Sequence, residues 1–479
     1  MSGRPGLYWK GLALCAPVVL SGCISMAPRH ETPTLPVAQH FADADQPDGT
    51  ANPLALRWQD YFNDPRLKAL IGTALAANRD LAVATARIEQ ARARYRAQDS
   101  QRLPAPEVSG SSTRNRASAE GLGTVPGAGG AMGDPVIFNR HEVGVGVTGF
   151  ELDFWGRVAN LSEAARAEYL ATAAARHAFR LSLIGEVAQT YFALIEADEQ
   201  IALAEATARS REEALRIARM RLDAGVTSAL PYRQAETLLT QAQQQVNAQR
   251  LAAAQARNQL DVLIGGRAPD DLPEGLDLSS QQLVRELDAG LPSRLLLARP
   301  DILAAEERLR GARASIGAAR AAFFPSISLT GNAGFGSTEL GSLFDDSGFR
   351  WSAGPALRLP IFNWGALKGD LDLARAREVE AVAQYDLAVQ RAFREVSDAL
   401  AGRRWLAGQV ETQSRAVDAQ AAIAHLAQLR YREGVADYLE VLDAERNLFT
   451  ARQSLLAAQR SAFQNDVSLY IALGGGAGD

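Results

Sequence analysis

The sequence predicts an α+β membrane protein built from two copies of one unit, each copy holding two strands and very long helices. Three observations carry this prediction: an internal duplication, two helix-forming runs far longer than those of globular proteins, and four short segments in which polar and apolar residues alternate. Mixed strands and helices of such unequal length are unusual in one soluble domain.

The duplication is visible without gaps over most of the chain. Residues 150–266 align with residues 359–475 at a constant shift of 209. The matched pairs are Trp155-Gly156 with Trp364-Gly365, Gly225-Val226 with Gly434-Val435, and Gly265-Gly266 with Gly474-Gly475. Upstream the alignment continues at a shift of 221, which brings Leu103-Pro104 onto Phe324-Pro325. Shared alanine richness does not explain matched pairs of this kind, so the chain is a tandem duplication.

The two alignment shifts differ by 12 residues, and the difference falls between Gly110 and Gly149. That interval is rich in glycine, alanine and proline, which is typical of a loop tip that tolerates insertions. The first copy is therefore expected to carry the longer loop between its strands.

The helix-forming runs extend from Val158 to about Leu222 and from Ala366 to about Arg432, and neither contains proline. Both are dense in Ala, Leu, Arg, Glu and Gln, which favour helix. A run of about 65 residues at 1.5 Å per residue gives a helix of roughly 100 Å. Helices of that length need lateral partners to bury their apolar stripes.

The strand signal is clearest in the second copy, where apolar and polar residues alternate with a period of two. Apolar positions there are Ile327, Leu329, Gly331, Ala333 and Phe335, then Phe349, Trp351, Ala353, Pro355, Leu357 and Leu359. Segments of about ten residues with one apolar face fit outer-membrane strands, although two soluble hairpins would show the same pattern. Four strands cannot close a wall in lipid, where about eight is the minimum. Three chains would supply twelve, so we expect an oligomer.

The N-terminus reads as an export signal. Arg4 and Lys10 precede an apolar run that ends in Leu20-Ser21-Gly22-Cys23, which is too short to span a bilayer. The small residues before Cys23 resemble a bacterial lipobox, in which the cysteine sulfur receives a diacylglycerol and becomes the mature N-terminus. An ordinary signal with an incidental cysteine is the alternative. Ile24, where an aspartate would favour inner-membrane retention, points to the outer membrane, and durable anchoring needs more than one acyl chain, such as palmitate.

Composition argues against several other classes. The net charge of −5 is small and mixed, so no nucleic-acid partner is implied. The histidines are His30, His40, His141, His177 and His425, and no two of them lie at metal-ligand spacing with a companion cysteine. No nucleophile motif or phosphate loop is present. We therefore expect no enzyme activity and no cofactor, apart from the covalent lipid on Cys23.

Several motifs together resemble the outer membrane factor family, which is TolC-like, and within it the OprM/NodT-type efflux lipoproteins. These are the lipobox, Phe324-Pro325, Pro360-Ile361-Phe362-Asn363-Trp364-Gly365, the run from Tyr431 to Arg446, and Leu469 to Gly476. The resemblance covers roughly residues 20–476. It implies a homotrimer whose twelve-stranded β-barrel, four strands per chain, is continuous with a long periplasmic α-helical barrel. It also implies a passive channel for drugs or other small molecules, anchored in outer-membrane lipid.

The family further implies two protein partners: a periplasmic adaptor (membrane fusion) protein and an inner-membrane pump of the RND type. Two rivals remain open. One is the outlet of a type I-like protein export system, which shares the fold. The other is a structural or adhesive surface lipoprotein, which would explain the helices and not the four strands.

The expected segments are the following. Residues 1–22 form the signal peptide and 23–63 an anchor and extended segment; 64–270 form the first repeat, with strands at 104–114 and 141–152 and helices at 157–222 and 230–264; 271–292 link the repeats; 293–476 form the second repeat, with strands at 325–336 and 349–360 and helices at 366–432 and 437–473.

The working residues are expected where the long helices turn. Glycine at such a turn is the usual left-handed cap of an ending helix. By the resemblance, this tip also docks the adaptor, through Gly225, Val226, Gly434, Val435, Arg221 and Arg430. We expect arginines near the turn, such as Arg430 or Arg432, to hold the tip closed by bonds to neighbouring helices.

The family's periplasmic gate, a leucine and an aspartate one helical turn apart, falls by motif match on Leu439 and Asp443. Their copies in the first repeat are Leu230 and Gln234, so the charge is absent there. A ring of carboxylates favours cations. The alternative is an ordinary helix-face acid beside a packing leucine.

Overall fold

The computed structural model describes residues 25–34, 36–38, 41, 52–117, 136–283, 287 and 298–475. The chain divides into two compact units. Unit 1 comprises Met1–Thr32, Gln90–Leu170 and Glu307–Val382, and unit 2 comprises Pro33–Glu89, Ala171–Glu306 and Ala383–Asp479. The expected signal peptide and Cys23 lie outside the described residues.

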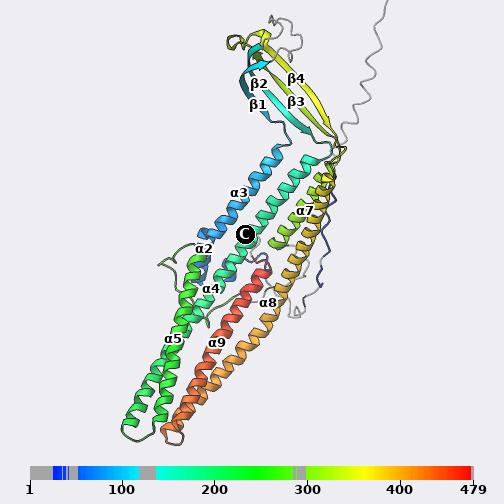
Figure 1. The fold of residues 1–479 in the computed structure, drawn as a ribbon. Coiled ribbons are helices and arrows are strands. Elements are labelled where there is room, and N and C mark those ends of the chain that lie inside the picture. The colour runs from blue at the N-terminus through cyan, green and yellow to red at the C-terminus, as the bar shows by residue number, and fades with distance from the viewer. Residues whose placement is uncertain are drawn as a thin grey trace, which may run out of the picture. The chain divides into compact units, whose positions relative to one another are not determined.

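The elements repeat in order, as the duplication predicts (Figure 1). The first copy contains α2 (Pro65–Ala77), α3 (Arg79–Ser100), β1 (Pro106–Ala117), β2 (Val136–Leu152), α4 (Arg157–Asp223) and α5 (Ala229–Leu263). The second contains α7 (Pro300–Ala321), β3 (Ser326–Ser337), β4 (Phe349–Arg358), α8 (Ala366–Arg432) and α9 (Tyr438–Ala472). The short helix α1 (Trp58–Tyr61) precedes both copies. Among the described helices, none has a stretch long and apolar enough to cross a membrane.

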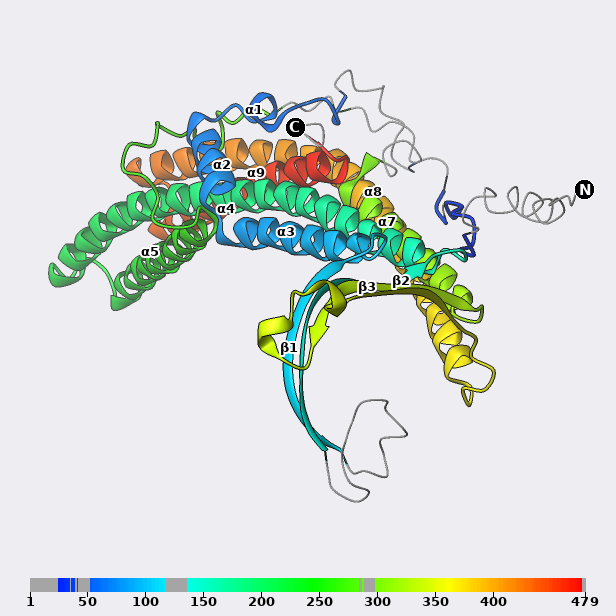
Figure 2. The ribbon, with the colours of Figure 1, turned by 90° about the horizontal axis from the view of Figure 1, so that it is seen from above.

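The four strands of unit 1 form one antiparallel sheet in the order β1-β2-β3-β4. Val108 pairs with Val145, Val145 with Ala333, and Ala333 with Trp351, so these four residues share one face. The same face carries Gly110, Val143, Val147, Ile327, Leu329, Phe335, Phe349 and Leu357, and at the far ends of β1 and β2 it turns polar, with Ser112, Arg114, Arg116, Asn139 and His141. In Figure 2 the sheet curls, with β1 and β2 bending strongly along their length.

The opposite face of the sheet is polar. It carries Glu107, Ser109, Ser111, Glu142, Ser328, Thr330, Asn332, Arg350, Ser352 and Arg358. Ser352 donates from its backbone N–H and its hydroxyl to Asn332 Oδ1, at 3.2 and 2.7 Å. Arg350 pairs with Glu142 at 3.3 Å. The sheet therefore separates an apolar from a polar environment.

Two strand bounds differ from the sequence expectation. Strand β2 begins at Val136 instead of residue 141, and β1 extends to Ala117 instead of 114. The reason is the ladder itself, which continues from Ser112↔His141 out to Ala117↔Val136. The apolar residues Ile137 and Phe138 sustain it beyond the point where period-two alternation ends.

The core of unit 2 forms where the helices meet the segment around α1 and α2. Tyr61 stacks on Tyr470 with ring centroids 4.1 Å apart, and its hydroxyl donates to the Asp466 carbonyl at 2.8 Å. Asp64 is fully buried and accepts from Tyr191 Oη at 2.9 Å and Gln281 Nε2 at 2.7 Å. Burial, followed by the charge of Asp64, raises the pKa of Tyr191. This carboxylate ties α2 to α4 and to the 276–281 segment.

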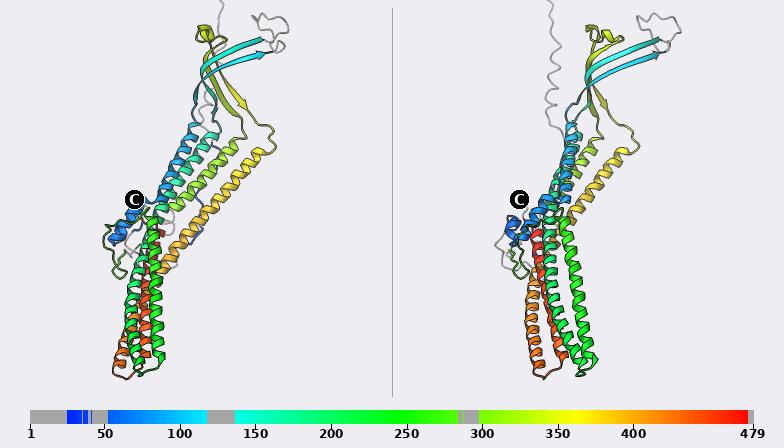
Figure 3. Two further views of the ribbon diagram at one scale, coloured as in Figure 1. Left: turned by 60° about the vertical axis from the view of Figure 1, so that its left-hand side comes forward. Right: turned by 90° about the vertical axis from the view of Figure 1, so that its left-hand side faces the viewer.

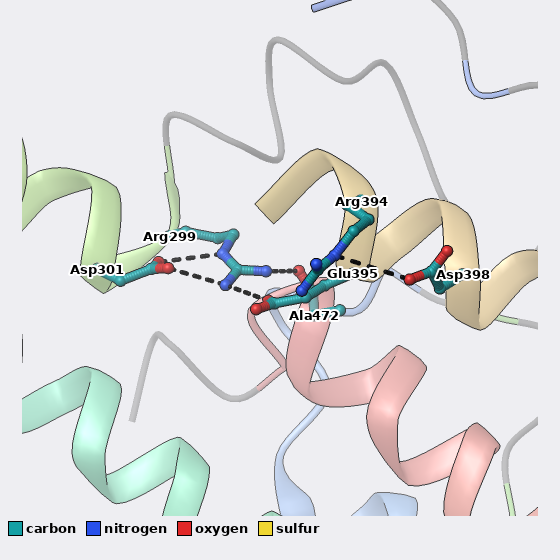
Figure 4. A network of polar contacts seen from close by, with 6 residues as sticks. All are labelled: Arg299, Asp301, Arg394, Glu395, Asp398 and Ala472. Atoms are coloured by element: carbon teal, nitrogen blue, oxygen red, sulfur yellow. Dashed lines mark hydrogen bonds and ion pairs between the residues drawn. The ribbon is translucent and has the colours of Figure 1, made fainter. Parts of the chain in front are cut away.

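A second polar network joins the start of α7 to α8 and α9 (Figure 4). Arg299 is buried and donates to the Ala472 carbonyl at 2.8 Å, to both carboxylate oxygens of Asp301, and to Glu395 at 2.8 Å. Burial by itself would lower the pKa of Arg299, but the two carboxylates outweigh it and raise that pKa. The guanidinium therefore remains charged and satisfies the last turn of α9.

Candidate functional site at the helical turns

The two helical hairpins turn through the same backbone motif. Val226 N–H donates to the Arg221 carbonyl at 3.0 Å, and Gly225 N–H to the Leu222 carbonyl at 2.9 Å. In the second copy Val435 donates to Arg430 at 2.9 Å and Gly434 to Tyr431 at 3.1 Å. This is the Schellman pattern, which satisfies carbonyls left unpaired by the ending helix.

A left-handed glycine is required at each turn. Gly225 has φ +68° and Gly434 has φ +74°, and a Cβ at either would meet open space. Val226 and Val435, one residue on, are exposed. Because nothing covers these apolar side chains within the described chain, the turns offer an exposed apolar surface at the tip of unit 2.

The second hairpin, α8 with α9, is fastened close to its turn. The Tyr431 and Tyr438 rings lie 5.0 Å apart, and Arg430 pairs with Glu440 at 3.4 Å. Below them a small core of Ala424, Ala427, Val441 and Ala444 is buried. Burial, then the charge of Glu445, raises the pKa of Tyr438 to about 12, so its hydroxyl stays neutral.

One side chain joins the two hairpins at the turns. Arg221, the last basic residue of α4, donates to the Tyr431 hydroxyl and places its guanidinium 5.9 Å from the centre of the Tyr431 ring. Figures 1 and 3 show the two turns side by side. A pocket of about 460 Å³ lies here, lined by residues of both hairpins, including Ile217, Thr227, Pro231, Arg432 and Asp437. Arg221 and Arg432 thus line one pocket, whereas Arg430 is not among its lining residues.

The gate candidates lie on the exposed side of α9. Leu439 and Asp443 are both exposed, whereas Val441 and Ala444 on the other side of the helix are buried. Asp443 pairs with Arg446, one turn further along the same helix, at 3.1 Å. The structure therefore keeps the gate pair free to face a partner, with the carboxylate partly offset by a neighbouring arginine.

The contacts of Tyr431 and Tyr438 were not expected from the sequence. We expected closing bonds from Arg430 or Arg432 to neighbouring helices, and Arg430 does pair with Glu440 on the adjacent helix α9. The bond between the two hairpins, however, runs from Arg221 to Tyr431. One signal was present: the copies of Tyr431 and Tyr438 in the first repeat are Leu222 and Ala229, so this pair of tyrosines occurs at the second turn only. Within the described ranges, no group of three His, Cys, Asp or Glu side chains is placed to hold a metal ion.

The sequence profile described as outer membrane efflux protein matches residues 70–266 and 291–475. The two matched segments follow the two copies of the duplicated unit. The chain belongs to the outer membrane efflux protein family.

Relatives in this family match along their whole length. The toluene efflux pump outer membrane protein TtgI of Pseudomonas putida is 41% identical over 475 residues, which are 98% of this chain and 99% of TtgI. The cation efflux system protein CusC of Escherichia coli is 38% identical over 470 residues, 98% of this chain and 99% of CusC. Full coverage means that the helical hairpins and the sheet are both shared.

Solved structures agree with this assignment. The open-state MtrE outer membrane channel of Neisseria gonorrhoeae superposes with a TM-score of 0.85 at 39% identity, covering 94% of this chain and 98% of MtrE. A CusC structure superposes with a TM-score of 0.81 at 36% identity, covering 94% and 100%. The expected TolC-like fold class is confirmed. So are the outer-membrane location and the role of an efflux-pump channel component that is not an enzyme.

Proposed function

We propose that this chain is the outlet of a tripartite efflux pump, working as a homotrimer that conducts small molecules passively to the exterior. The observation that carries the proposal is the two-faced sheet of unit 1. Its apolar face runs on β3 from Ile327 to Phe335, about 26 Å at 3.3 Å per residue. A membrane-spanning strand of a barrel, tilted by about 45°, needs about 9–11 residues, and this segment has that length.

The free edges of this sheet support the trimer. Strands β1 and β4 each pair on one side only within the described residues. Unpaired strand edges are not tolerated in lipid, so a barrel wall must continue into another chain. Three copies of a four-stranded sheet would close a twelve-stranded barrel. Light scattering of the detergent-extracted protein should give about three protomer masses, and a stable monomer that conducts ions would refute the trimer.

For the cargo we propose small apolar or amphipathic molecules. Relatives include solvent, toluene and antibiotic efflux proteins as well as CusC, a cation efflux protein. Downstream of the expected cleavage site the chain has only Met26, Met132 and Met220, few soft ligands for a metal-ion pathway.

The cargo proposal is tested in cells lacking their own outlet. The chain is expressed with the adaptor and pump of a solvent system, and toluene tolerance and dye accumulation are measured. Restored tolerance supports the proposal. Secretion of a type I export substrate without restored tolerance would favour the protein-export alternative.

The remaining assignments complete this proposal. Cys23 carries the lipid anchor, and the turns with Arg221, Arg430, Val226 and Val435 dock a periplasmic adaptor that connects to an inner-membrane pump of the RND type. Mass spectrometry of the mature N-terminus tests the first assignment, and an unmodified residue there would refute it. Adaptor cross-linking to cysteines at Val226 and Val435, with Val246 as a buried control on α5, tests the second.

A further inference from the structure

The corner between strand and long helix occurs twice in unit 1, and the two copies are in different surroundings. In the first copy Trp155 donates its Nε1–H to the Pro325 carbonyl at 2.9 Å. Its ring lies 4.8 Å from the ring of Phe324. The end of the first strand hairpin therefore packs against the beginning of the second strand hairpin, at Phe324-Pro325.

The second copy has the same tryptophan but no such contact within the described chain. Trp364, the counterpart of Trp155, is 102% exposed and has φ +53°, the one described non-glycine residue with positive φ. A large exposed ring on strained backbone is costly unless something covers it.

The beginning of the first strand hairpin is equally exposed. Leu103 is 70% exposed, whereas its counterpart Phe324 is 39% exposed. Val108 is 83% exposed, whereas its counterpart Leu329 is 41% exposed. Each uncovered position lacks the neighbour that the other copy has inside the chain. The two bare surfaces are the two halves of one contact.

We propose that Trp364 docks on the Leu103-Pro104 corner of a second copy of this chain and donates its Nε1–H to the partner's Pro104 carbonyl. The contact repeats between subunits what Trp155 does with Pro325 inside one subunit. This inference rests on the proposed trimer and deepens it, because it names the residues that meet and the register in which the sheets join.

The register follows from the internal sheet. Hairpin β1–β2 pairs Pro106 with Val147, and hairpin β3–β4 pairs Ile327 with Leu357. Ile327 is the counterpart of Pro106 at the shift of 221. Their partners within the two hairpins, Leu357 and Val147, are therefore counterparts of each other as well. The in-chain pair Val147↔Gly331 then becomes Leu357 opposite the partner's Gly110.

The rest of the ladder is consistent with this pair. A bulge interrupts the β2–β3 ladder between Val147 and Phe150. Beyond it Phe150 pairs with Leu329, and the shifts of 209 and 221 turn this pair into Leu359 opposite the partner's Val108. In both pairs the two residue numbers add up to 467. A constant sum means that no residue is inserted between the pairs, so the ladder between β4 and the partner's β1 continues without a bulge. In both pairs, the two residues come from the apolar face. A slip by one residue would put an apolar position against a polar one along the whole edge.

The upper end of the joint adds a chemical match. By the same register Trp351, exposed on β4, lies opposite the partner's Arg116. An arginine beside a tryptophan ring gives a cation–π contact, which strengthens where water is excluded. The same rule therefore produces an apolar contact at one end of the joint and a cation–aromatic contact at the other.

The first experiment tests the register with paired cysteines. Leu357→Cys with Gly110→Cys should give covalent trimers on non-reducing gels, because directly opposed strand residues lie within disulfide range. A Cβ at Gly110 has room, its one close neighbour being the Glu142 carbonyl at 3.9 Å. The matched control is Ala356→Cys with Gly110→Cys, which points the two thiols to opposite faces.

The outcomes separate the two proposals. Covalent trimers that form with the Leu357→Cys and Gly110→Cys pair, and are absent from the control, support the register. Covalent trimers with the Ala356→Cys pair overturn the register while leaving the trimer standing. A protein that is monomeric by light scattering in every variant overturns the trimer itself.

The second experiment tests Trp364. Trp364→Ala and Leu103→Ala should each speed dissociation of the detergent-solubilised trimer about tenfold, and the double variant no more than either alone, because both remove one contact. Trp364→Phe keeps an aromatic ring but loses the hydrogen-bond donor, so its trimer should dissociate at a rate between those of the parent and Trp364→Ala. Effects that multiply in the double variant would show that Trp364 meets lipid headgroups instead, as interfacial tryptophans do, and would overturn the contact.

Discussion

The two copies of the unit perform one structural task with different side chains. Asn78 donates to the Leu263 carbonyl at 2.8 Å, and Arg299 donates to the Ala472 carbonyl at 2.8 Å. Asn78 lies just before α3 and Arg299 just before α7, and each acceptor lies in the last turn of the final helix of its copy. The duplication thus preserved the backbone requirement, an unpaired carbonyl needing a donor, and left the donor free to change.

The same lesson holds at the turns. Gly225, Gly265, Gly434 and Gly474 all have positive φ, so both copies end their helices identically. The side chains around those glycines differ, since Tyr431 occurs where the first copy has Leu222. Backbone geometry was retained in both copies, while side-chain contacts diverged wherever one copy met a different neighbour.

Substituting the paired glycines Gly265 and Gly474 should give the largest difference between the two copies in the loss of unfolding free energy. A Cβ at Gly265 would overlap the Ala77 carbonyl oxygen, whereas a Cβ at Gly474 would meet only the flexible Leu54 side chain, at 3.2 Å. Gly265→Ala adds overlap to left-handed strain and should cost about 4 kcal/mol. Gly474→Ala adds strain alone and should cost about 1–2 kcal/mol. Urea unfolding followed by circular dichroism measures both, and equal losses would contradict the distinction.

Substituting the donors Asn78 and Arg299 by alanine should give stability losses that differ by less. Arg299→Ala strands a carbonyl and leaves Asp301 and Glu395 facing each other, at a cost of about 3 kcal/mol. Asn78→Ala removes the bond to Leu263 and the one from the Leu81 N–H, at a cost of about 2 kcal/mol.

Salt distinguishes the two losses. Added salt screens the repulsion between Asp301 and Glu395, so the Arg299→Ala deficit should shrink at high ionic strength. The Asn78→Ala deficit involves neutral groups and should stay constant. Identical salt dependence would mean that the carboxylates do not contribute.

Much of this fold could be predicted from the sequence because its signals are local and repeated. Proline-free runs fixed the extent of α4 and α8, and period-two alternation assigned the apolar face of β3 and β4. The turn glycines were found because a left-handed cap demands glycine wherever the helix ends. The weak alternation at the outer ends of β1 and β2 hid their true length, which depends on pairing and not on pattern.

The contacts between the hairpins could not be predicted in this way. Whether Arg221 reaches Tyr431 depends on how two hairpins about 200 residues apart approach each other, and no periodicity encodes that distance. Arg299 likewise reads as an ordinary charged residue until α8 and α9 are packed around it. The roles of Leu439 and Asp443 remain predictions.

Removing the bond between the hairpins should have a moderate effect on opening. Tyr431→Phe deletes the hydroxyl that accepts from Arg221 and keeps the ring packed on Tyr438. One lost hydrogen bond of about 1 kcal/mol should raise the open probability about fivefold in planar bilayers. Tyr438→Phe, whose hydroxyl belongs to the same hairpin, is the control and should behave like the parent. Unchanged conductance in Tyr431→Phe would place the closing bond elsewhere.

The smallest expected effect concerns ion selectivity, where the copies differ by one charge. Asp443 in the second copy corresponds to Gln234 in the first, and three copies of Asp443 would surround the bore of a trimer. The carboxylate is paired with Arg446 at 3.1 Å on an exposed helix face, so its field is already partly offset. Asp443→Asn should therefore shift the reversal potential in a salt gradient by only a few millivolts toward anions. Arg446→Gln should shift it the other way, because it uncovers the carboxylate.

Gln234→Ala is the matched control in the first copy and should leave the potential unchanged. Opposite shifts from Asp443→Asn and Arg446→Gln would place the pair on the conduction path, whereas parallel or absent shifts would leave Asp443 as an ordinary surface acid.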